Sequence, residues 1–141
     1  MTPEEVNGLI AKRAAAFSRL DAAALGALYA ENCVVDTPAG GGTVTGRDAN
    51  ENVYRGFFAA FPDLTIETQQ VVSEGSHIAQ LYTAVGTNAG GFMGLPPTGK
   101  RFRFNGAFIF TVENGQITRE RRIYDFTGVL VQIGVLKARP Q

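Results

Sequence analysis

The sequence has almost none of the side chains that build disulfides or soft-metal sites. Its 141 residues include one cysteine, Cys33, and one histidine, His77. A single cysteine excludes an internal disulfide framework, and a single histidine leaves a His/Cys metal site with too few ligands. We therefore expect no bound metal. Cys33 is expected to be a small buried hydrophobic residue and His77 a surface residue near a turn.

The sequence also lacks a net charge and a long apolar run. Thirteen basic residues balance thirteen acidic ones, and the pI is about 6.6, which excludes a general nucleic-acid binder. No apolar run approaches the ~18 residues that a membrane span needs. The acidic N-terminus is unlike a secretory signal. These absences predict a soluble, cytoplasmic protein without nucleic-acid or membrane partners.

Length and composition are typical of one globular domain, which we expect to span residues 1–141. Hydrophobic residues make up 45% and charged residues 18% of the chain. A domain of this size buries roughly two-thirds of the surface of its unfolded chain, which is enough for one core. Glycine is enriched, with 17 residues, and the clusters at 40–46 and 86–99 favour tight loops around a cavity mouth.

The first part of the chain predicts three helices. Thr2, Pro3 and Glu5 form the start signal of a helix whose apolar residues recur at spacings of three and four through Leu20. A second helix is expected over 22–30, with Asp21 as its cap. A third helix runs from about residue 47 to Phe61, where Pro62 ends it. Its aromatic face comprises Tyr54, Phe57, Phe58 and Phe61.

The second part of the chain predicts an antiparallel sheet, because the apolar period changes from about 3.6 to about 2 after Pro62. The strongest turn signal is Asn114-Gly115, since this pair tolerates positive φ. Strands are expected at 33–37, 64–72, 78–87, 101–112 and 116–126, and a last short helix at 127–135. Segregated helices and strands predict an α+β domain. We expect three N-terminal helices packed on a curved, mostly antiparallel sheet of about five or six strands that encloses a cone-shaped cavity.

Asp125, near the end of the last predicted strand, is the candidate acid/base. By alternation it shares a face with Arg121 and Ile123, whereas Tyr124 and Phe126 share the other face. If the Asp125 face lines the cavity, desolvation raises its pKa toward the range of a general base. The alternative is an exposed strand-end carboxylate or one paired with Arg121.

The loop at 86–100 is rich in glycine and proline and could approach a ligand closely. Phe92 and Met93 could form an apolar lip, and Asn88, at the end of a strand, could orient a ligand oxygen. The Gly99-Lys100 pair is not a phosphate cradle, because it precedes a strand and not a helix. A rigid structural crossover is the alternative for most of this loop.

Four further residues are candidate walls of the cavity. Tyr54 and Phe57 of the third helix could hold a flat ligand, although an aromatic stripe at helical spacing is more often plain core. Gln80 and Tyr82 share strand parity with Asn88 and could line the same side.

A series of short motifs resembles the SnoaL-like polyketide cyclase family, within the nuclear transport factor 2-like superfamily. The motifs are Phe61-Pro62-Asp63-Leu64, Gly86-Thr87-Asn88, Gly94-Leu95-Pro96-Pro97-Thr98-Gly99-Lys100, Asn114-Gly115-Gln116-Ile117, Asp125 and Gln132-Ile133-Gly134. The resemblance implies a cone-shaped barrel, often a homodimer formed through the sheets, and a small hydrophobic, polyketide-like substrate. It also implies ring closure by intramolecular aldol condensation without metal or organic cofactor, with Asp125 as acid/base.

One departure from the family pattern affects the expected chemistry. Many relatives carry histidine where this chain has Asn88, and an amide exchanges hydrogen bonds but not protons. Two alternatives therefore stay open. One is a ketosteroid-isomerase-like proton shuttle, which needs a second acidic donor, for which Asp36 and Tyr82 are the candidates. The other is a non-catalytic module that binds a small molecule or dimerises.

Overall fold

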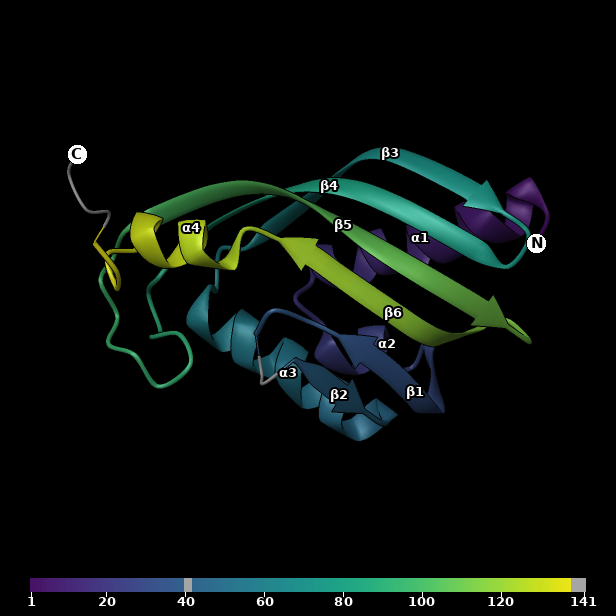
Figure 1. Cartoon of the computed structure of the whole chain (residues 1–141), viewed down its shortest axis with the longest axis horizontal. Coiled ribbons are helices and arrows are strands. Elements are labelled where there is room, and N and C mark those ends of the chain that lie inside the picture. Colours follow the sequence, from purple (N-terminus) through teal and green to yellow (C-terminus); the bar gives the residue numbers. More distant parts are fainter. Residues whose placement is uncertain (40–41, 138–141) are drawn as a thin grey trace.

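The computed structural model describes residues 1–39 and 42–137 and has an α+β architecture (Figure 1). The helices are α1 (Pro3–Ser18), α2 (Ala22–Gly26), α3 (Arg47–Ala60) and α4 (Phe126–Gln132). The strands are β1 (Tyr29–Asp36), β2 (Thr43–Thr45), β3 (Thr65–Glu74), β4 (His77–Thr87), β5 (Arg101–Glu113) and β6 (Gln116–Tyr124). The predicted fold class is confirmed, and β2 is a strand that the sequence pattern did not predict.

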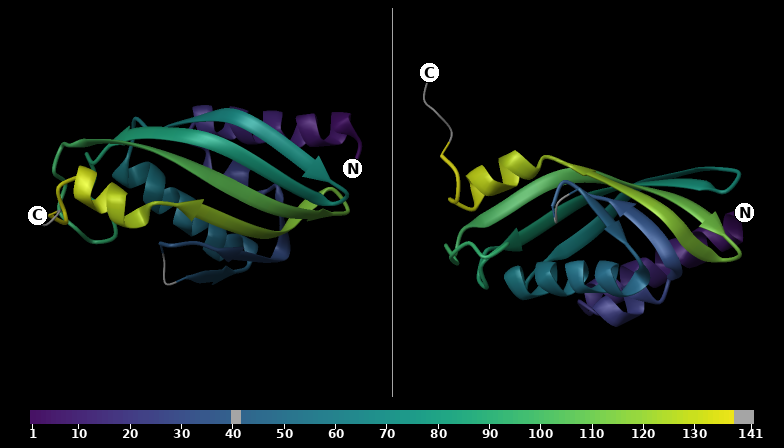
Figure 2. Two further views of the ribbon diagram at one scale, coloured as in Figure 1. Left: turned by 45° about the horizontal axis from the view of Figure 1, so that its top comes forward. Right: turned by 60° about the horizontal axis from the view of Figure 1, so that its bottom comes forward.

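The six strands form one curved sheet in the order β2-β1-β6-β5-β4-β3. Neighbouring strands are antiparallel except for β1 and β6, which run parallel. Within the described residues the edge strands β2 and β3 do not pair, so the sheet stays open and is not a closed barrel. Helices α1, α2 and α3 lie under one face of the sheet, and α4 follows β6 at the end of the molecule (Figure 2).

The first helix begins as its sequence predicts. The Thr2 side chain accepts a hydrogen bond from the Glu5 backbone, and the Glu5 side chain accepts one from the Thr2 backbone. The second helix is shorter than predicted, because β1 already begins at Tyr29. Tyr29, which falls within the range predicted for that helix, is instead a fully buried strand residue.

A β-bulge decides which residues of β6 face the helices. The pairing with β5 shifts between Thr111 and Val112, so that Ile117 and Glu120 both point inward, three positions apart. Inward residues then continue at Arg122 and Tyr124, and Ile123 is 47% exposed on the other face. One extra residue therefore reverses the alternation along the rest of the strand.

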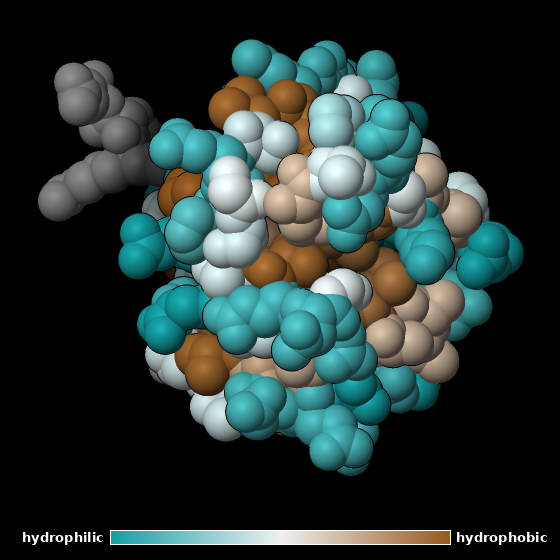
Figure 3. Space-filling model, turned by 90° about the vertical axis from the view of Figure 1, so that its right-hand side faces the viewer, coloured by the Kyte–Doolittle hydropathy of each residue, from teal (hydrophilic) through white to brown (hydrophobic). Residues whose placement is uncertain are grey.

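The core between sheet and helices is unusually aromatic. Phe17, Phe58, Phe61, Phe102, Phe108 and Phe110 are all buried there. Figure 3 views the end of the molecule that carries the N-terminus, where hydrophilic residues surround a smaller hydrophobic area. No helix in the described part of the chain is long and apolar enough to cross a membrane.

Candidate functional site

An apolar pocket lies between the sheet and helices α1 and α3 and reaches α4. Its volume is about 60 Å³, well below the ~300 Å³ of a typical site for a drug-sized ligand. Its walls are almost entirely aromatic and aliphatic. The lining residues are Phe17, Tyr54, Phe57, Phe58, Phe61, Leu64, Ile66, Tyr82, Ala84, Phe92, Phe102, Phe104, Phe108, Arg122, Tyr124 and Val129.

Four of the predicted binding residues line this pocket: Tyr54, Phe57, Tyr82 and Phe92. The ring of Tyr82 stacks on Phe108 with centroids 4.2 Å apart. The ring of Phe92 packs against that of Phe57, with centroids 5.3 Å apart. The loop after β4 therefore closes one side of the pocket. Of the two residues expected to form an apolar lip, Phe92 is part of the pocket wall.

The other two predicted binding residues lie elsewhere. Gln80 is buried behind the pocket, where its side chain donates to Thr68 Oγ1 and accepts from Arg13 Nε. Met93 is 53% exposed and is not part of the pocket lining.

Asn88 organises the loop after β4 and has no free amide hydrogen for a ligand. Its Nδ2 donates to the Pro96 carbonyl at 3.3 Å and to Thr98 Oγ1 at 3.2 Å. Its Oδ1 accepts from the Gly91 backbone at 3.2 Å. The side chain is fully buried and does not line the pocket, so its geometry is that of a loop anchor.

Asp125 is exposed and caps α4. Its carboxylate accepts a hydrogen bond from the Gly128 backbone at 2.9 Å. It does not line the pocket and does not share a cavity with Asn88. The predicted alternation was correct, but the bulge turns the Arg121, Ile123 and Asp125 face outward. The geometry therefore does not support the expectation that Asp125 works inside the cavity.

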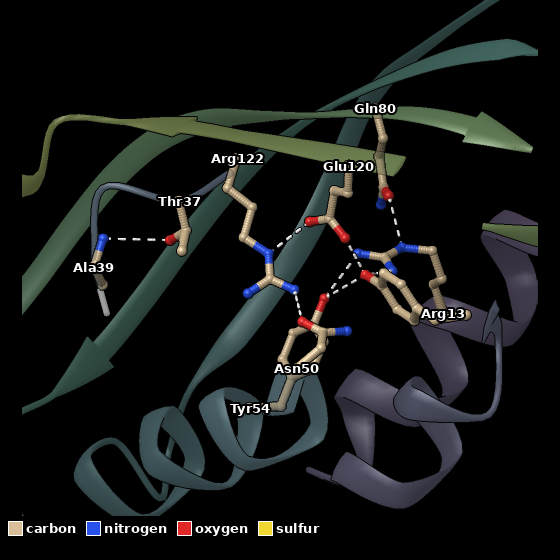
Figure 4. Close-up of polar contacts among 9 residues, drawn as sticks. Arg13, Thr37, Ala39, Asn50, Tyr54, Gln80, Glu120 and Arg122 are labelled. Carbon is tan, nitrogen blue, oxygen red and sulfur yellow. Dashed lines mark hydrogen bonds and ion pairs between the residues drawn. The ribbon is translucent and has the colours of Figure 1, made fainter. Parts of the chain in front are cut away.

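A buried polar cluster lies beside the pocket and borders it through Arg122 and Tyr54 (Figure 4). Glu120 and Arg122 project from β6 toward the helices, and Arg122 Nε donates to Glu120 at 2.6 Å. Arg122 Nη2 donates to Asn50 Oδ1, on α3, at 2.6 Å. The guanidinium of Arg122 also lies over the ring of Tyr54, 4.4 Å from its centroid.

A second buried guanidinium, that of Arg13 on α1, completes the cluster. It is 0% exposed and donates to Gln80, to Tyr29 at 3.0 Å and to Tyr54 at 3.5 Å. Its central carbon, Cζ, lies 4.4 Å from the centroid of the Phe110 ring. The Tyr29 hydroxyl in turn donates to Glu120. Sheet and helices are thus joined by one hydrogen-bond network.

The surroundings fix the charges of these groups. Burial raises the pKa of Glu120. The positive charges of Arg122 and Arg13 lower it, and the lowering effects together outweigh burial, so the net shift is downward and Glu120 is ionised. Burial raises the pKa of Tyr29 well above its ordinary value and that of Tyr82 as well. The pKa of Tyr124 rises to about 12, mainly through burial. These tyrosines are therefore neutral at physiological pH.

Three residues of the site, Arg13, Glu120 and Arg122, were not predicted from the sequence. One signal was available for Arg13, because it lies four residues from both Leu9 and Phe17 on the apolar stripe of α1. No simple signal marked the β6 pair, because alternation from buried Ile117 without a bulge places Arg122 outside. In the described part of the chain, no group of three or more His, Cys, Asp or Glu side chains could hold a metal ion.

Comparisons with known proteins agree with this architecture. Residues 9–133 match the family described as SnoaL-like polyketide cyclase. IdmH of Streptomyces antibioticus, a proposed polyketide cyclase, is 31% identical, with a TM-score of 0.75 over 92% of this chain and 98% of IdmH. No curated protein matches the chain.

Two further solved structures share the fold at lower identity. AclR of Streptomyces galilaeus, a proposed hydroxylase, is 24% identical, with a TM-score of 0.83 over 99% of this chain and 87% of AclR. TsrD of Streptomyces laurentii is 24% identical, with a TM-score of 0.84 over 96% of this chain and 99% of TsrD.

Proposed function

The chain belongs to the SnoaL-like polyketide cyclase family, and from this premise we propose that it binds a small apolar carbonyl compound and promotes an aldol-type ring closure within it. The substrate lies among the aromatic walls, with one carbonyl oxygen directed at Arg122. The observation that carries the proposal is that Arg122 is the sole charged side chain lining the pocket within the described residues.

Arg122 is suited to stabilise charge that develops on a carbonyl oxygen. Its hydrogen bonds to Glu120 and Asn50 hold the guanidinium in place before any ligand arrives. A fixed cation in apolar surroundings stabilises an enolate or alkoxide more than water does, and it needs no reorganisation during the reaction. Removal of one such donor in other enzymes costs roughly 10²–10³ in rate.

The aromatic walls contribute by folding the substrate. Ring closure requires that two carbons of one molecule meet, and positioning of this kind can supply several kcal/mol, up to about 7–11 in well-oriented systems. Because the pocket holds about 60 Å³, a polyketide-sized substrate requires side chains to move apart. Phe57, Leu64 and Phe104 are among the wall residues that are only half-buried, so their side chains are candidates for such a movement.

A second candidate, non-catalytic binding of a small apolar molecule, is favoured by one specific observation. No carboxylate lines the pocket within the described residues, so the strong base that a proton shuttle of the ketosteroid-isomerase type needs is absent from that lining. A binding module needs only the apolar walls and the Arg122 cation.

A rate comparison tests the proposal and separates it from mere binding. Linear aromatic di- and triketones are incubated with wild-type protein, Arg122→Met and Arg121→Met, and cyclised product is followed by chromatography against buffer. We expect acceleration with wild type and Arg121→Met and a loss of at least tenfold with Arg122→Met. Binding of the ketones without acceleration would favour the second candidate, and neither binding nor acceleration would overturn both.

We also propose that two copies pair through the outer face of the sheet. Val72, Leu81, Ile109 and Ile123 are exposed large hydrophobic residues on β3 to β6, and register places Leu81 and Ile123 on either side of Ala107. Sedimentation of wild type and Ile123→Glu tests this. A dimer that becomes a monomer in the variant supports the proposal, and a monomeric wild type contradicts it.

A further inference from the structure

The buried cluster carries one positive charge in excess. Arg13 and Arg122 are 0% and 6% exposed, and Glu120, the one carboxylate bonded to either of them in the described residues, is 0% exposed. The remaining partners of the two guanidinium groups are neutral amides and hydroxyls. An uncompensated buried charge is costly, so this arrangement favours a ligand that brings the missing negative charge.

Among the pocket-lining members of the cluster, the unused hydrogen-bonding capacity lies on Arg122, whereas Asn50 Nδ2 also has no partner among the described residues but belongs to a residue outside the lining. All three nitrogens of Arg13 donate within the cluster. Arg122 uses Nε and Nη2, and its remaining terminal nitrogen, Nη1, has no partner among the described residues (Figure 4). Because Arg122 lines the pocket, a ligand that enters it meets the side chain that carries this nitrogen.

A second unused donor stands two residues further along the same face of β6. The Tyr124 hydroxyl is buried and makes no hydrogen bond within the described part of the chain. Tyr124 also lines the pocket, and Arg122 and the Thr37 side chain are near enough to lower its pKa against the larger effect of burial. Arg122 Nη1 and the Tyr124 hydroxyl are therefore two neighbouring donors on pocket-lining residues that a ligand oxygen can engage.

We infer that the pocket selects the anionic form of an acidic, mostly apolar ligand, an enolate or a phenolate, and anchors its oxygen between Arg122 and Tyr124. This inference rests on the proposed function and names its substrate class: compounds that ionise at a carbon flanked by carbonyls or at an aromatic hydroxyl. A neutral ester or ether of the same shape lacks the charge that the cluster leaves unbalanced.

The pocket lining needs no carboxylate base, because the ligand loses its proton to water. The ligand's C–H or O–H bond breaks, the electron pair stays on the ligand as the enolate or phenolate, and the proton goes to water. Arg122 and Tyr124 keep their own protons and donate hydrogen bonds to the new oxyanion. The pocket thus shifts the ionisation of its ligand without a carboxylate in its lining, and no other reactant is consumed.

The wild-type protein provides the primary test. We titrate 4-nitrophenol, whose phenolate has its own visible absorption band, free and in the presence of excess protein, and 4-nitroanisole serves as the matched neutral probe. We expect the ionisation midpoint of bound 4-nitrophenol to fall by at least one pH unit, which equals a tenfold preference for the phenolate. An unshifted or raised midpoint would overturn the inference.

Variants test whether the shift of the ionisation midpoint depends on Arg122, on the inner face of β6. The midpoint shift is expected to disappear in Arg122→Met and to remain in Arg121→Met, whose side chain points outward. If Arg122→Met does not fold, the double variant Glu120→Gln/Arg122→Met removes the buried pair together. A shift that survives loss of Arg122 contradicts the inference.

The outcomes separate this inference from the function on which it rests. Equal binding of 4-nitrophenol and 4-nitroanisole without a midpoint shift refutes anion selection and leaves the apolar binding function intact. If neither probe binds and the linear aromatic di- and triketones do not bind either, the binding function is refuted and, with it, the inference.

Discussion

The two faces of β6 differ in which side chains they bury: charged residues are buried on the inner face, and a large hydrophobic residue is exposed on the outer face. On the inner face, Glu120 and Arg122 are buried, at 0% and 6% exposure. On the outer face, Ile123 is 47% exposed. Hydrophobic burial alone would not bury Glu120 and Arg122 while leaving Ile123 exposed. The bulge between β5 and β6 produces this arrangement.

This inversion is not explained by stability. A buried ion pair loses hydration that its mutual attraction barely repays, and replacement by apolar residues is often neutral or stabilising. Positions where local preference and fold disagree are the places where function is expected. The inner face of β6 is therefore where the account locates ligand recognition, and the outer face serves as its matched control.

The largest expected effect is that of Glu120→Gln. The substitution keeps the shape of the side chain but leaves Arg13 and Arg122 buried without a carboxylate, which should cost about 3–5 kcal/mol of unfolding free energy. Urea unfolding measures it. The exposed Glu113→Gln, on β5, is the control and should change little. A loss below about 1 kcal/mol for Glu120→Gln would show that the cluster relaxes without its anion.

The same carboxylate should make the fold sensitive to acid. Because the net effect of burial, Arg122 and Arg13 is to lower the folded-state pKa of Glu120, its stabilising contribution is present above the unfolded value. That contribution is lost as pH falls through the folded pKa. The free energy of unfolding measured from pH 7 to pH 3 should therefore fall less steeply in Glu120→Gln than in wild type. Parallel curves would contradict this assignment.

Substitution of Asp125 should have a smaller, purely structural effect. Asp125→Ala removes the cap on the Gly128 backbone and should cost about 1 kcal/mol. Asp125→Asn keeps a capping oxygen and should leave both stability and ring closure nearly unchanged. A large loss of turnover with normal stability in Asp125→Asn would restore the acid/base role predicted from the sequence.

The smallest effect is expected on the outer face. Arg121 is exposed, and Arg121→Gln should change the free energy of unfolding by no more than about 0.5 kcal/mol. Thermal unfolding alongside Glu120→Gln measures the contrast between the two faces directly. Comparable losses from the two variants would mean that the faces do not differ as the structure implies.

Most of the fold could be predicted from local signals. The Thr2 cap, the change of period after Pro62 and the Asn114-Gly115 turn each act within a few residues, and each marks an element that the structure contains. The predicted end of α2 and the predicted start of β1 were less accurate, because the packing of Tyr29 against the cluster overrides the local helix propensity.

The site could be predicted only in its apolar part. Tyr54 and Phe57 follow from helical spacing, and both line the pocket. Its polar wall depends on a bulge at Thr118, opposite the shift between Thr111 and Val112. A bulge is a property of strand pairing, so nothing in residues 116–125 taken alone indicates that Arg122 faces inward and Asp125 outward.

A structure of the protein with bound 4-nitrophenolate tests the central claim most directly, through the distance from the phenolate oxygen to Arg122 Nη1. The account predicts a hydrogen bond of about 2.7–3.0 Å, with the aromatic ring among Tyr54, Phe58 and Tyr82. A probe bound outside this pocket, or inside it with its oxygen turned away from Arg122, would contradict it.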